Sequence, residues 1–275
     1  VYARIGSPRF QHDPFTGYCR GLLIEESRTN ILLNSSIGGE NLPSQTISTS
    51  AITYTLSFYG TGYIVLSGAA SGTIYGNGAY PSKKTYTFAS NGGNLNVNVY
   101  GSVIYANLEA GLFSTSFIPT AGTAITRASD IATIASAEFY TFYNQSTNGT
   151  IYACGDGAYG TNPVVYSLLE SPSNTDYCHY YSIINGQNQN FDVFNNGSRI
   201  VSMTFNNSVA DNSNFAGTTA ITSNGFKSSV QDYAIKKVNS GTAPSNFTKL
   251  DLGSLNGAYF LNGCISLLSY YNDIL

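Results

Sequence analysis

Residues 191–205 read Phe-Asp-Val-Phe-Asn-Asn-Gly-Ser-Arg-Ile-Val-Ser-Met-Thr-Phe, two alternating runs of apolar and polar side chains around Asn195-Asn196-Gly197. Alternation with a period of two is typical of a half-buried strand, and Asn-Gly between two such runs favours a tight hairpin. Residues 95–100, Leu-Asn-Val-Asn-Val-Tyr, alternate in the same way and would turn Leu95, Val97 and Val99 toward a core. Both stretches predict antiparallel sheets.

The composition of the whole chain agrees with these stretches. Its 275 residues include 28 Gly, 22 Tyr and as many Asn as Gly, but no Trp and one Met. Charged residues make up 10%, against about 25% in an average soluble domain, which excludes a highly charged disordered chain. Strand and turn formers dominate over the residues of long helices, so we expect an all-β protein.

The charge pattern excludes two classes of partner. The net charge is −3, and Lys and Arg cluster no further than the pairs Lys83-Lys84 and Lys236-Lys237. A phosphate-binding groove needs clustered cations, so nucleic acid is not an expected partner. No stretch approaches 18 unbroken apolar residues, so we expect no membrane insertion.

The distribution of strand and turn signals predicts four parts. Residues 1–50 show little periodicity and are expected to form an extended anchoring arm. Residues 51–109 are expected to form a small β-sandwich, and residues 110–128 a connector without a helix, because it contains small residues and a proline. Residues 129–275 hold denser strands and predict a larger jelly roll, in which 139–143 and 150–153 would form a hairpin around Asn148-Gly149.

Three parts of the chain resemble segments of known proteins. A leader segment of many bacteriophage virion proteins is similar to Pro8-Arg9-Phe10, Asp13-Pro14, Thr16-Gly17, Gly21-Leu22-Leu23-Ile24-Glu25 and Arg28-Thr29-Asn30. The connector that follows in those proteins is similar to Asn107-Leu108-Glu109-Ala110-Gly111, Thr115-Ser116-Phe117-Ile118-Pro119-Thr120 and Thr126-Arg127-Ala128-Ser129-Asp130. The C-terminal part, with its closing residues 259–265 and Tyr270-Tyr271, resembles a concanavalin A-like lectin/glucanase (laminin-G-like) jelly roll.

The resemblance implies a structural protein of a phage particle, such as a tail fibre, a head fibre or a capsid decoration, that is made in the host cytoplasm. It implies that the N-terminal arm contacts other virion proteins, that the chain forms a homotrimer, and that the jelly roll attaches to a host-surface glycan. The middle unit departs from this pattern, because it is shorter than the carbohydrate-module-like sandwich of the family.

The residues of hydrolytic chemistry are sparse. A Ser-His-Asp triad needs a suitable histidine, and only His12 and His179 exist. Glycoside cleavage needs two carboxylates close together, whereas the acids here are isolated apart from Glu25-Glu26. We therefore expect no catalytic residue, cofactor or metal. A carboxylate pair made only by the fold, such as Glu138 with Glu170, leaves a glycan depolymerase as an alternative, and a purely structural module without a ligand is another.

Sugar binding needs planar amides, carboxylates and aromatic faces, and two predicted loops of the jelly roll hold such groups. The candidate glycan-binding residues are Asp156, Tyr159, Asn162, Asp211, Asn212 and Asn214. Tyr177, Tyr180 and Tyr181 offer further aromatic faces. The same loops hold the oxygen atoms that calcium would need, but we interpret them as turns stabilised by Asx side chains. Cys154 and Cys178 would form a disulfide only if their strands are neighbours.

Overall fold

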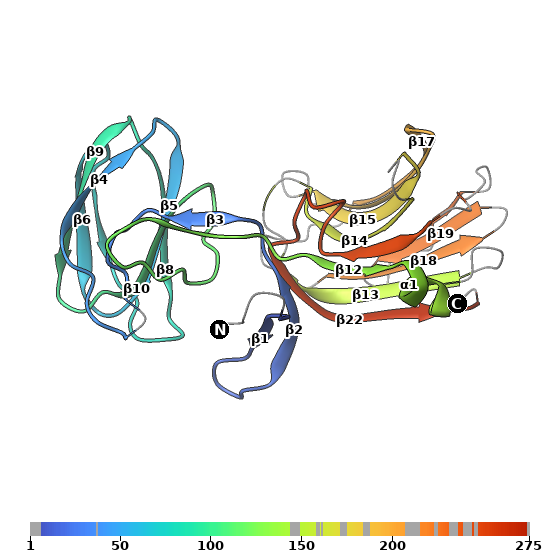
Figure 1. Cartoon of the computed structure of the whole chain (residues 1–275), viewed down its shortest axis with the longest axis horizontal. Helices are drawn as coiled ribbons and strands as arrows, with labels where there is room; N and C mark the ends of the chain where they lie inside the picture. Colours follow the sequence, from blue (N-terminus) through green and yellow to red (C-terminus); the bar gives the residue numbers. More distant parts are fainter. Residues whose placement is uncertain are drawn as a thin grey trace. The chain divides into compact units, whose positions relative to one another are not determined.

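The computed structural model describes residues 7–36, 38–143, 149–157, 160, 162–170, 175–183, 188–206, 215–222, 225–230, 236–238, 244 and 247–273 (Figure 1). The chain divides into two compact units. Unit 1 combines Val1–Glu26 with Asp130–Leu275, and unit 2 is Ser27–Ser129. The chain therefore starts in unit 1, builds unit 2, and returns to complete unit 1.

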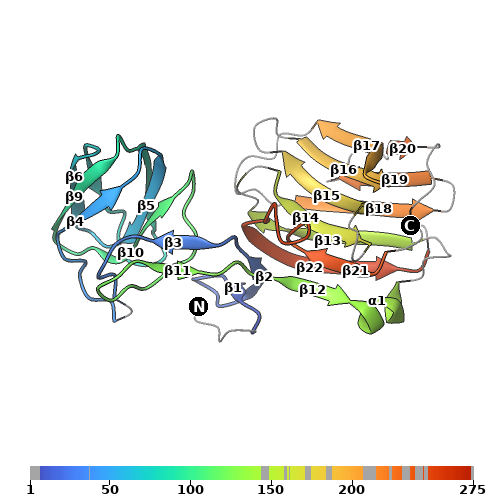
Figure 2. The same ribbon diagram turned by 45° about the horizontal axis from the view of Figure 1, so that its top comes forward.

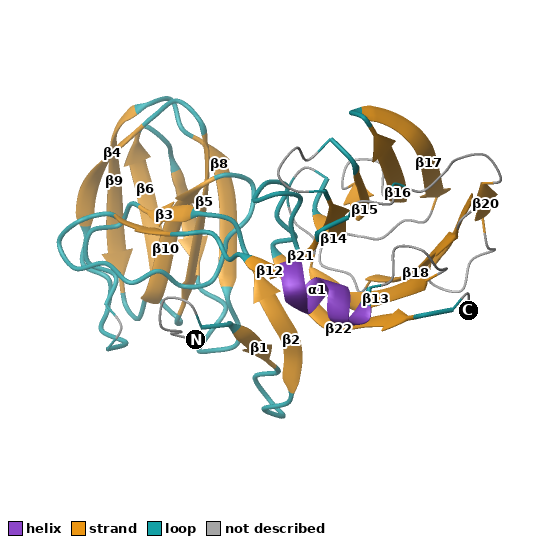
Figure 3. Ribbon diagram, turned by 45° about the vertical axis from the view of Figure 1, so that its right-hand side comes forward, coloured by secondary structure: helices purple, strands orange, loops and turns teal. Residues whose placement is uncertain are grey.

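Unit 1 contains two antiparallel sheets that lie as two layers (Figures 1 and 3). The six-stranded sheet has the order β12 (Ala132–Ala135), β21 (Lys249–Leu252), β14 (Val164–Leu169), β15 (Tyr177–Ile183), β16 (Asn188–Asn195) and β17 (Ser198–Asn206). Figure 2 shows β14 to β17 side by side. The seven-stranded sheet has the order β1 (Phe10–His12), β2 (Cys19–Ile24), β22 (Gly263–Tyr271), β13 (Gly149–Gly157), β18 (Phe215–Thr222), β19 (Gly225–Val230) and β20 (Lys236–Val238).

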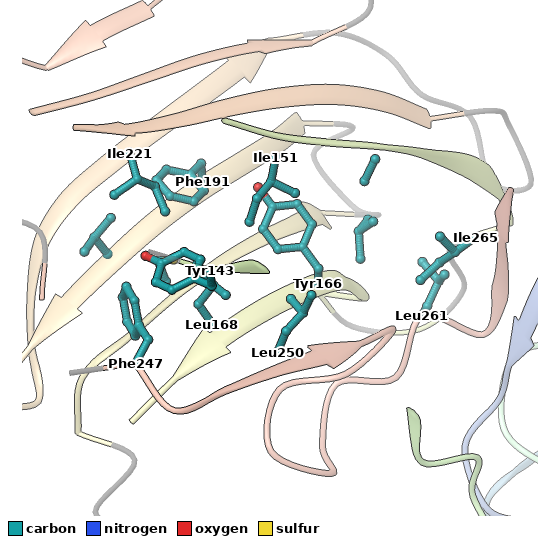
Figure 4. Close-up of a cluster of buried hydrophobic side chains, with 14 of the residues drawn as sticks. Tyr143, Ile151, Tyr166, Leu168, Phe191, Ile221, Phe247, Leu250, Leu261 and Ile265 are labelled. Carbon is teal, nitrogen blue, oxygen red and sulfur yellow. The ribbon is translucent and has the colours of Figure 1, made fainter. Parts of the chain in front are cut away.

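Apolar side chains from both sheets fill the space between the layers (Figure 4). The labelled members of this core are Tyr143, Ile151, Tyr166, Leu168, Phe191, Ile221, Phe247, Leu250, Leu261 and Ile265. The helix α1 (Ser136–Phe142) follows β12 directly and adds Phe139, which is fully buried. Among the residues that the structure describes, no helix has the length and hydropathy to cross a bilayer.

Unit 2 is a smaller antiparallel sandwich with its own core. Its four-stranded sheet has the order β4 (Gln45–Thr49), β9 (Gly93–Tyr100), β6 (Tyr63–Gly68) and β7 (Gly72–Tyr75). Its three-stranded sheet has the order β10 (Ile104–Ala110), β5 (Thr53–Tyr59) and β8 (Lys84–Ala89). A two-stranded ribbon joins β3 (Arg28–Asn30) to β11 (Ile125–Arg127). Leu56, Phe58, Ile64, Leu95 and Val97 are buried between the sheets.

The all-β prediction is confirmed, and the hairpin of residues 191–205 forms as expected from β16 and β17. Asn196 and Gly197 connect these strands with φ values of 49° and 74°. Both therefore adopt the left-handed conformation that a two-residue type I′ hairpin loop requires. The predicted strand over 139–143 is wrong, because these residues belong to α1 and its C-terminal end.

The prediction of an extended arm over residues 1–50 is also wrong for the part that the structure describes. Strand β2 pairs with β22 of the same chain, with Leu22 opposite Ile265. Leu22 and Ile24 turn toward the core of unit 1. Gly21 permits this pairing, because a Cβ atom there would lie 2.3 Å from the backbone oxygen of Ile265. β3 and β4, which also fall within residues 1–50, belong to unit 2.

The conspicuous polar residues of the leader and connector segments lie in buried networks. In unit 1, the Arg9 guanidinium bonds the Asp130 carboxylate, with Nε 2.9 Å from Oδ1, and its Nη2 lies 2.8 Å from Oε2 of Glu25. In unit 2, the buried side chain of Asn30 donates to the backbone oxygens of Ala106 and Ile118. In both units, polar side chains of the leader thus bond to residues in or next to the connector.

Glu109 and Thr115 extend the network of unit 2. The fully buried Glu109 carboxylate accepts a hydrogen bond from the Thr115 backbone N–H at 3.0 Å and another from the Thr115 hydroxyl. Burial raises the pKa of Glu109, while the bonds from Thr115 and the charges of Arg28 and Arg127 act in the opposite direction. A buried carboxylate needs this set of donors and cations, so Glu109 is explained as a structural residue.

Candidate functional site

The structure describes two of the six predicted site residues. Asp156 lies on β13, and its carboxylate forms an ion pair with Arg20 of β2 at 2.8 Å. Partial burial raises the pKa of Asp156, and the Arg20 charge opposes this shift. Asn162 lies in the segment before β14 with a φ of 51°. No hydrogen bond or ion pair joins the described residues Asp156 and Asn162, while Tyr159, Asp211, Asn212 and Asn214 lie outside the described residues.

A different set of side chains gathers on the outward side of the six-stranded sheet. Cys178, Phe191 and Val193 point into the core. Since side chains alternate along a strand, their neighbours Tyr177, His179 and Asp192 point the other way. We call this outward surface the polar face, and its members considered below are Ser167, Tyr177, His179, Asn190, Asp192, Phe194, Arg199, Lys249 and Asp251.

Three near-parallel rings form the centre of the polar face. The Tyr177 and Phe194 rings, which are cross-strand partners, stack with centroids 4.3 Å apart and planes 15° from parallel. The His179 ring lies 5.5 Å from that of Tyr177 at 17°. The rings of Tyr177 and Phe194 are half-buried. Aromatic groups favour such offset stacking, so the cluster offers a pre-ordered apolar platform within a polar surface.

Charged groups border this platform. The buried Asp192 lies directly opposite His179 in the sheet, and its carboxylate lies 3.5 Å from the Arg199 guanidinium. The Arg199 side chain remains 57% exposed, so much of its hydrogen-bonding capacity faces solvent. Burial lowers the pKa of His179 to about 4, although the Asp192 charge opposes this shift. His179 is therefore a neutral imidazole at neutral pH.

A loop after β21 lies against the same face. The Ser167 hydroxyl donates to the backbone oxygen of Ser254 at 2.8 Å, and the Asn256 backbone N–H donates to the Asp251 carboxylate at 3.1 Å. This loop carries the exposed Tyr259. Burial raises the pKa of Tyr177, and the Asp192 charge and Tyr259 add to the shift.

One amide on the polar face is unusual. Asn190, on β16, is almost fully buried, and its Nδ2 has no hydrogen-bond partner among the described residues. Leaving a buried amide donor unsatisfied costs about 1–3 kcal/mol, so such a group generally has a structural or functional reason. Asn190 and Asp192 are two residues apart on β16 and therefore lie on the same side of the sheet. The unsatisfied amide of Asn190 is thus next to the charged part of the face.

The comparisons with known proteins concern the fold. No protein-family model matches the sequence, and a search of curated proteins finds no relative. Among solved structures, the chain is similar to the CBM40 of a Ruminococcus gnavus IT-sialidase bound to α2,3 sialyllactose, at 16% identity over 47% of this chain and 78% of that chain, with a TM-score of 0.40. It is also similar to domains LG4-5 of the mouse laminin α1 chain, at 9% identity over 98% and 93%, with a TM-score of 0.41. A toad ovary galectin with thio-digalactose aligns at 6% identity over 52% and 100%, with a TM-score of 0.37.

The described residues provide no metal cluster, since they contain no group of three or more His, Cys, Asp or Glu side chains arranged to hold an ion. The cysteines at 19, 154, 178 and 264 are free thiols, so the Cys154–Cys178 bridge does not form. The polar face offers stacked rings, a neutral imidazole, an exposed guanidinium and amide and carboxylate groups. This set can bind a neutral or weakly charged ligand that carries many hydroxyl groups.

The sequence holds a local signal for part of this face. Tyr177 is among the predicted aromatic candidates, whereas His179, Asp192, Phe194 and Arg199 are not predicted site residues. The alternation that sends Phe191 and Val193 into the core also turns Asp192 outward. The register that places Asp192 opposite His179 comes from the pairing of β15 with β16 and is not visible in either strand alone.

Proposed function

We propose that this chain is a non-enzymatic virion protein of a bacteriophage that attaches the particle to a host-surface glycan through the polar face of unit 1. The observation that carries the proposal is the stacked Tyr177–Phe194 pair beside the Asp192–Arg199 ion pair. Aromatic faces bind the C–H surface of a sugar ring, and charged donors and acceptors bind its hydroxyl groups. We therefore place the glycan site on the polar face and not at the sequence-predicted candidates around Asp156 and Asp211.

In this proposal a sugar ring continues the stack of aromatic rings. Arg199 donates to ring hydroxyls from its exposed guanidinium, and the buried Asp192 holds that guanidinium in place. Tyr259, in the loop that lies against this face, offers the ligand a further exposed ring. Because His179 is neutral and Asp192 is already paired, the face carries little net charge, and binding depends weakly on salt.

Two features support the virion assignment and the homotrimer. The first is that the leader and the connector, which resemble phage segments, bond to each other in the folded chain. Arg9 of the leader bonds Asp130 of the connector, and the side chain of Asn30 donates to the backbone oxygen of Ile118. The hairpin of β1 and β2 exposes Phe15 by 83% and Tyr18 by 76%. Such exposed aromatic side chains are suited to contacts with sister chains or other virion proteins. Light scattering of a Phe15→Ser, Tyr18→Ser variant should show a smaller species than the parent, and equal masses would refute this contact.

The glycan proposal is tested by comparing two matched ion pairs. Arg199→Gln removes the charge beside the stacked rings, whereas Arg20→Gln removes the equivalent arginine beside Asp156 on the other sheet. On an array of bacterial surface glycans, Arg199→Gln should weaken binding about tenfold, because a hydrogen bond to a charged group contributes about 1.5–3 kcal/mol. Arg20→Gln should bind like the parent.

The outcomes also separate the alternatives. Weaker binding with Arg20→Gln alone would move the site to Asp156, as the sequence predicted. Release of reducing sugar from the bound polysaccharide would make the chain a depolymerase. Adsorption to no glycan on the array would leave a purely structural module.

A further inference from the structure

The outward side of the four-stranded sheet in unit 2 is a second surface with a distinct composition. Ile64, Leu66, Leu95 and Val97 point into the core, so the alternate residues of the same strands point outward. We call this surface the tyrosine–asparagine face, and its members are Thr46, Ser48, Tyr63, Val65, Ser67, Thr73, Tyr75, Asn94, Asn96, Asn98 and Tyr100. None of the four strands contains a charged residue.

Three tyrosines cross this face in one row. Tyr63 lies opposite Tyr75 on one side and Tyr100 on the other. The ring of Tyr63 is 5.4 Å from that of Tyr75 and 4.8 Å from that of Tyr100, with the second pair 13° from parallel. Tyr75 is 66% exposed and lies on the edge strand β7, so the row ends in a ring with an accessible face.

Amides and hydroxyls fill the rest of the face. The Thr46 hydroxyl donates to Oδ1 of Asn96 at 2.8 Å, which orients the Asn96 amide. The side chains of Asn94 and Asn98 flank Asn96 on the same strand and make no hydrogen bond to another described residue. Their donors and acceptors are therefore available to a ligand that lies along β9.

The two sheets of unit 2 differ in whether their outward sides are covered. The outward side of the three-stranded sheet is covered by the connector, since the Thr55 hydroxyl donates to the backbone oxygen of Gly111 at 2.8 Å and Thr87 donates to that of Leu112 at 3.3 Å. Thr55 and Ser57 are buried as a result. The four-stranded sheet has no such cover among the described residues of unit 2.

We propose that the tyrosine–asparagine face is a second binding site, which takes an uncharged glycan chain. The centre of a protein–protein contact is enriched in methionine and arginine as well as aromatic side chains and is depleted in serine. This face has the tyrosines but neither methionine nor arginine, and its other members are asparagine, serine, threonine and one valine. A nucleic acid or an acidic polysaccharide would need cations, which the four strands lack. Tyrosine rings and hydroxyls with free amides match a ligand that combines C–H ring faces with neutral hydroxyl groups.

This site is separate from the polar face, because its residues belong to unit 2 and the polar face belongs to unit 1. The two proposals can therefore fail independently. The chain would hold two glycan contacts in one polypeptide, and two linked contacts bind a repeating surface more tightly than either does alone.

The test uses the full chain carrying Arg199→Gln, so that the polar face contributes little. Native gels containing laminarin or dextran, which are neutral, are compared with gels containing hyaluronan, which is acidic. We expect at least one neutral polysaccharide to retard the protein, and hyaluronan to leave its mobility unchanged. Adding Tyr75→Ala or Asn98→Ala should each raise the dissociation constant at least fivefold.

Matched controls separate binding from folding. Tyr140→Ala removes an exposed tyrosine from helix α1 of unit 1, and Asn77→Ala removes an exposed asparagine from a loop of unit 2, so both should leave retardation unchanged. Because the Tyr75 ring packs against that of Tyr63, the melting temperature of every variant is measured, and Asn98→Ala decides the result if Tyr75→Ala is unstable. Retardation by hyaluronan only, by no polysaccharide, or equally in Asn98→Ala and its control would overturn the proposal.

Discussion

Asn30 offers the sharpest test of the buried network in unit 2. Its Nδ2 donates to the backbone oxygens of Ala106 and Ile118 at 3.0 and 2.8 Å, and its Oδ1 accepts from the backbone N–H groups of Leu108 and Leu32 at 2.9 and 3.2 Å. The side chain is fully buried. Asn30→Ala would therefore leave at least two buried donors without this acceptor, and each unsatisfied group costs about 1–3 kcal/mol.

The expected loss is about 3 kcal/mol in the free energy of unfolding of unit 2. For a domain of roughly 100 residues, 1 kcal/mol corresponds to about 4–8 °C, so the melting temperature of this unit should fall by about 12–24 °C. Calorimetry gives the shift, and hydrogen exchange with mass spectrometry shows whether the amides around Leu108 lose protection. Asn94→Ala, at an exposed position, should change stability by no more than about 0.5 kcal/mol.

The reasoning would be refuted if Asn30→Ala melted within about 4 °C of the parent. It would also be refuted if exchange around Leu108 were unchanged while unit 1 lost protection. Either result would mean that the leader residue does not hold the strands of unit 2 together.

His179 has a pKa lowered to about 4 by burial, so the unfolded chain binds more protons than the folded chain between about pH 6.5 and pH 4. The free energy of unfolding should therefore fall as the pH is lowered across that window. Urea titrations at several pH values should show a smaller fall for His179→Gln, and the same fall as the parent for His12→Gln, which replaces an exposed histidine. Gly21→Ala should detach β2 from β22, because its Cβ would lie 2.3 Å from the Ile265 backbone oxygen and its φ of 140° disfavours alanine. Limited proteolysis should cleave this variant in the β1–β2 hairpin. Gly38→Ala should stay resistant, because its φ is not left-handed and its Cβ would meet no atom closer than 3.5 Å. Equal cleavage of the two variants would contradict the pairing.

The local parts of the fold could be predicted because their signals are local. The hairpin turn at Asn196-Gly197 could be predicted because two residues that tolerate positive φ stand between two alternating runs. The helix α1 was missed because a short aromatic run suits either structure. Phe139, Phe142 and Tyr143 lie at positions i, i+3 and i+4, and their rings contact one another only when the segment is helical.

The remaining features depend on contacts between distant parts of the chain. Nothing in residues 19–24 indicates that Leu22 will pair with Ile265 near the other end of the chain. The polar face has the same origin, since Tyr177 and Phe194 become neighbours only through the register of β15 and β16. Residue types could suggest glycan chemistry, but the sheet pairing decides which side chains meet.

The most direct test of the proposed function is a crystal structure of the full chain with the glycan that binds best on the array. The account predicts a sugar ring stacked on the Tyr177–Phe194 platform, with a hydroxyl within hydrogen-bonding distance of the Arg199 guanidinium. A glycan bound to unit 1 beside Asp156, with the polar face empty, would contradict it.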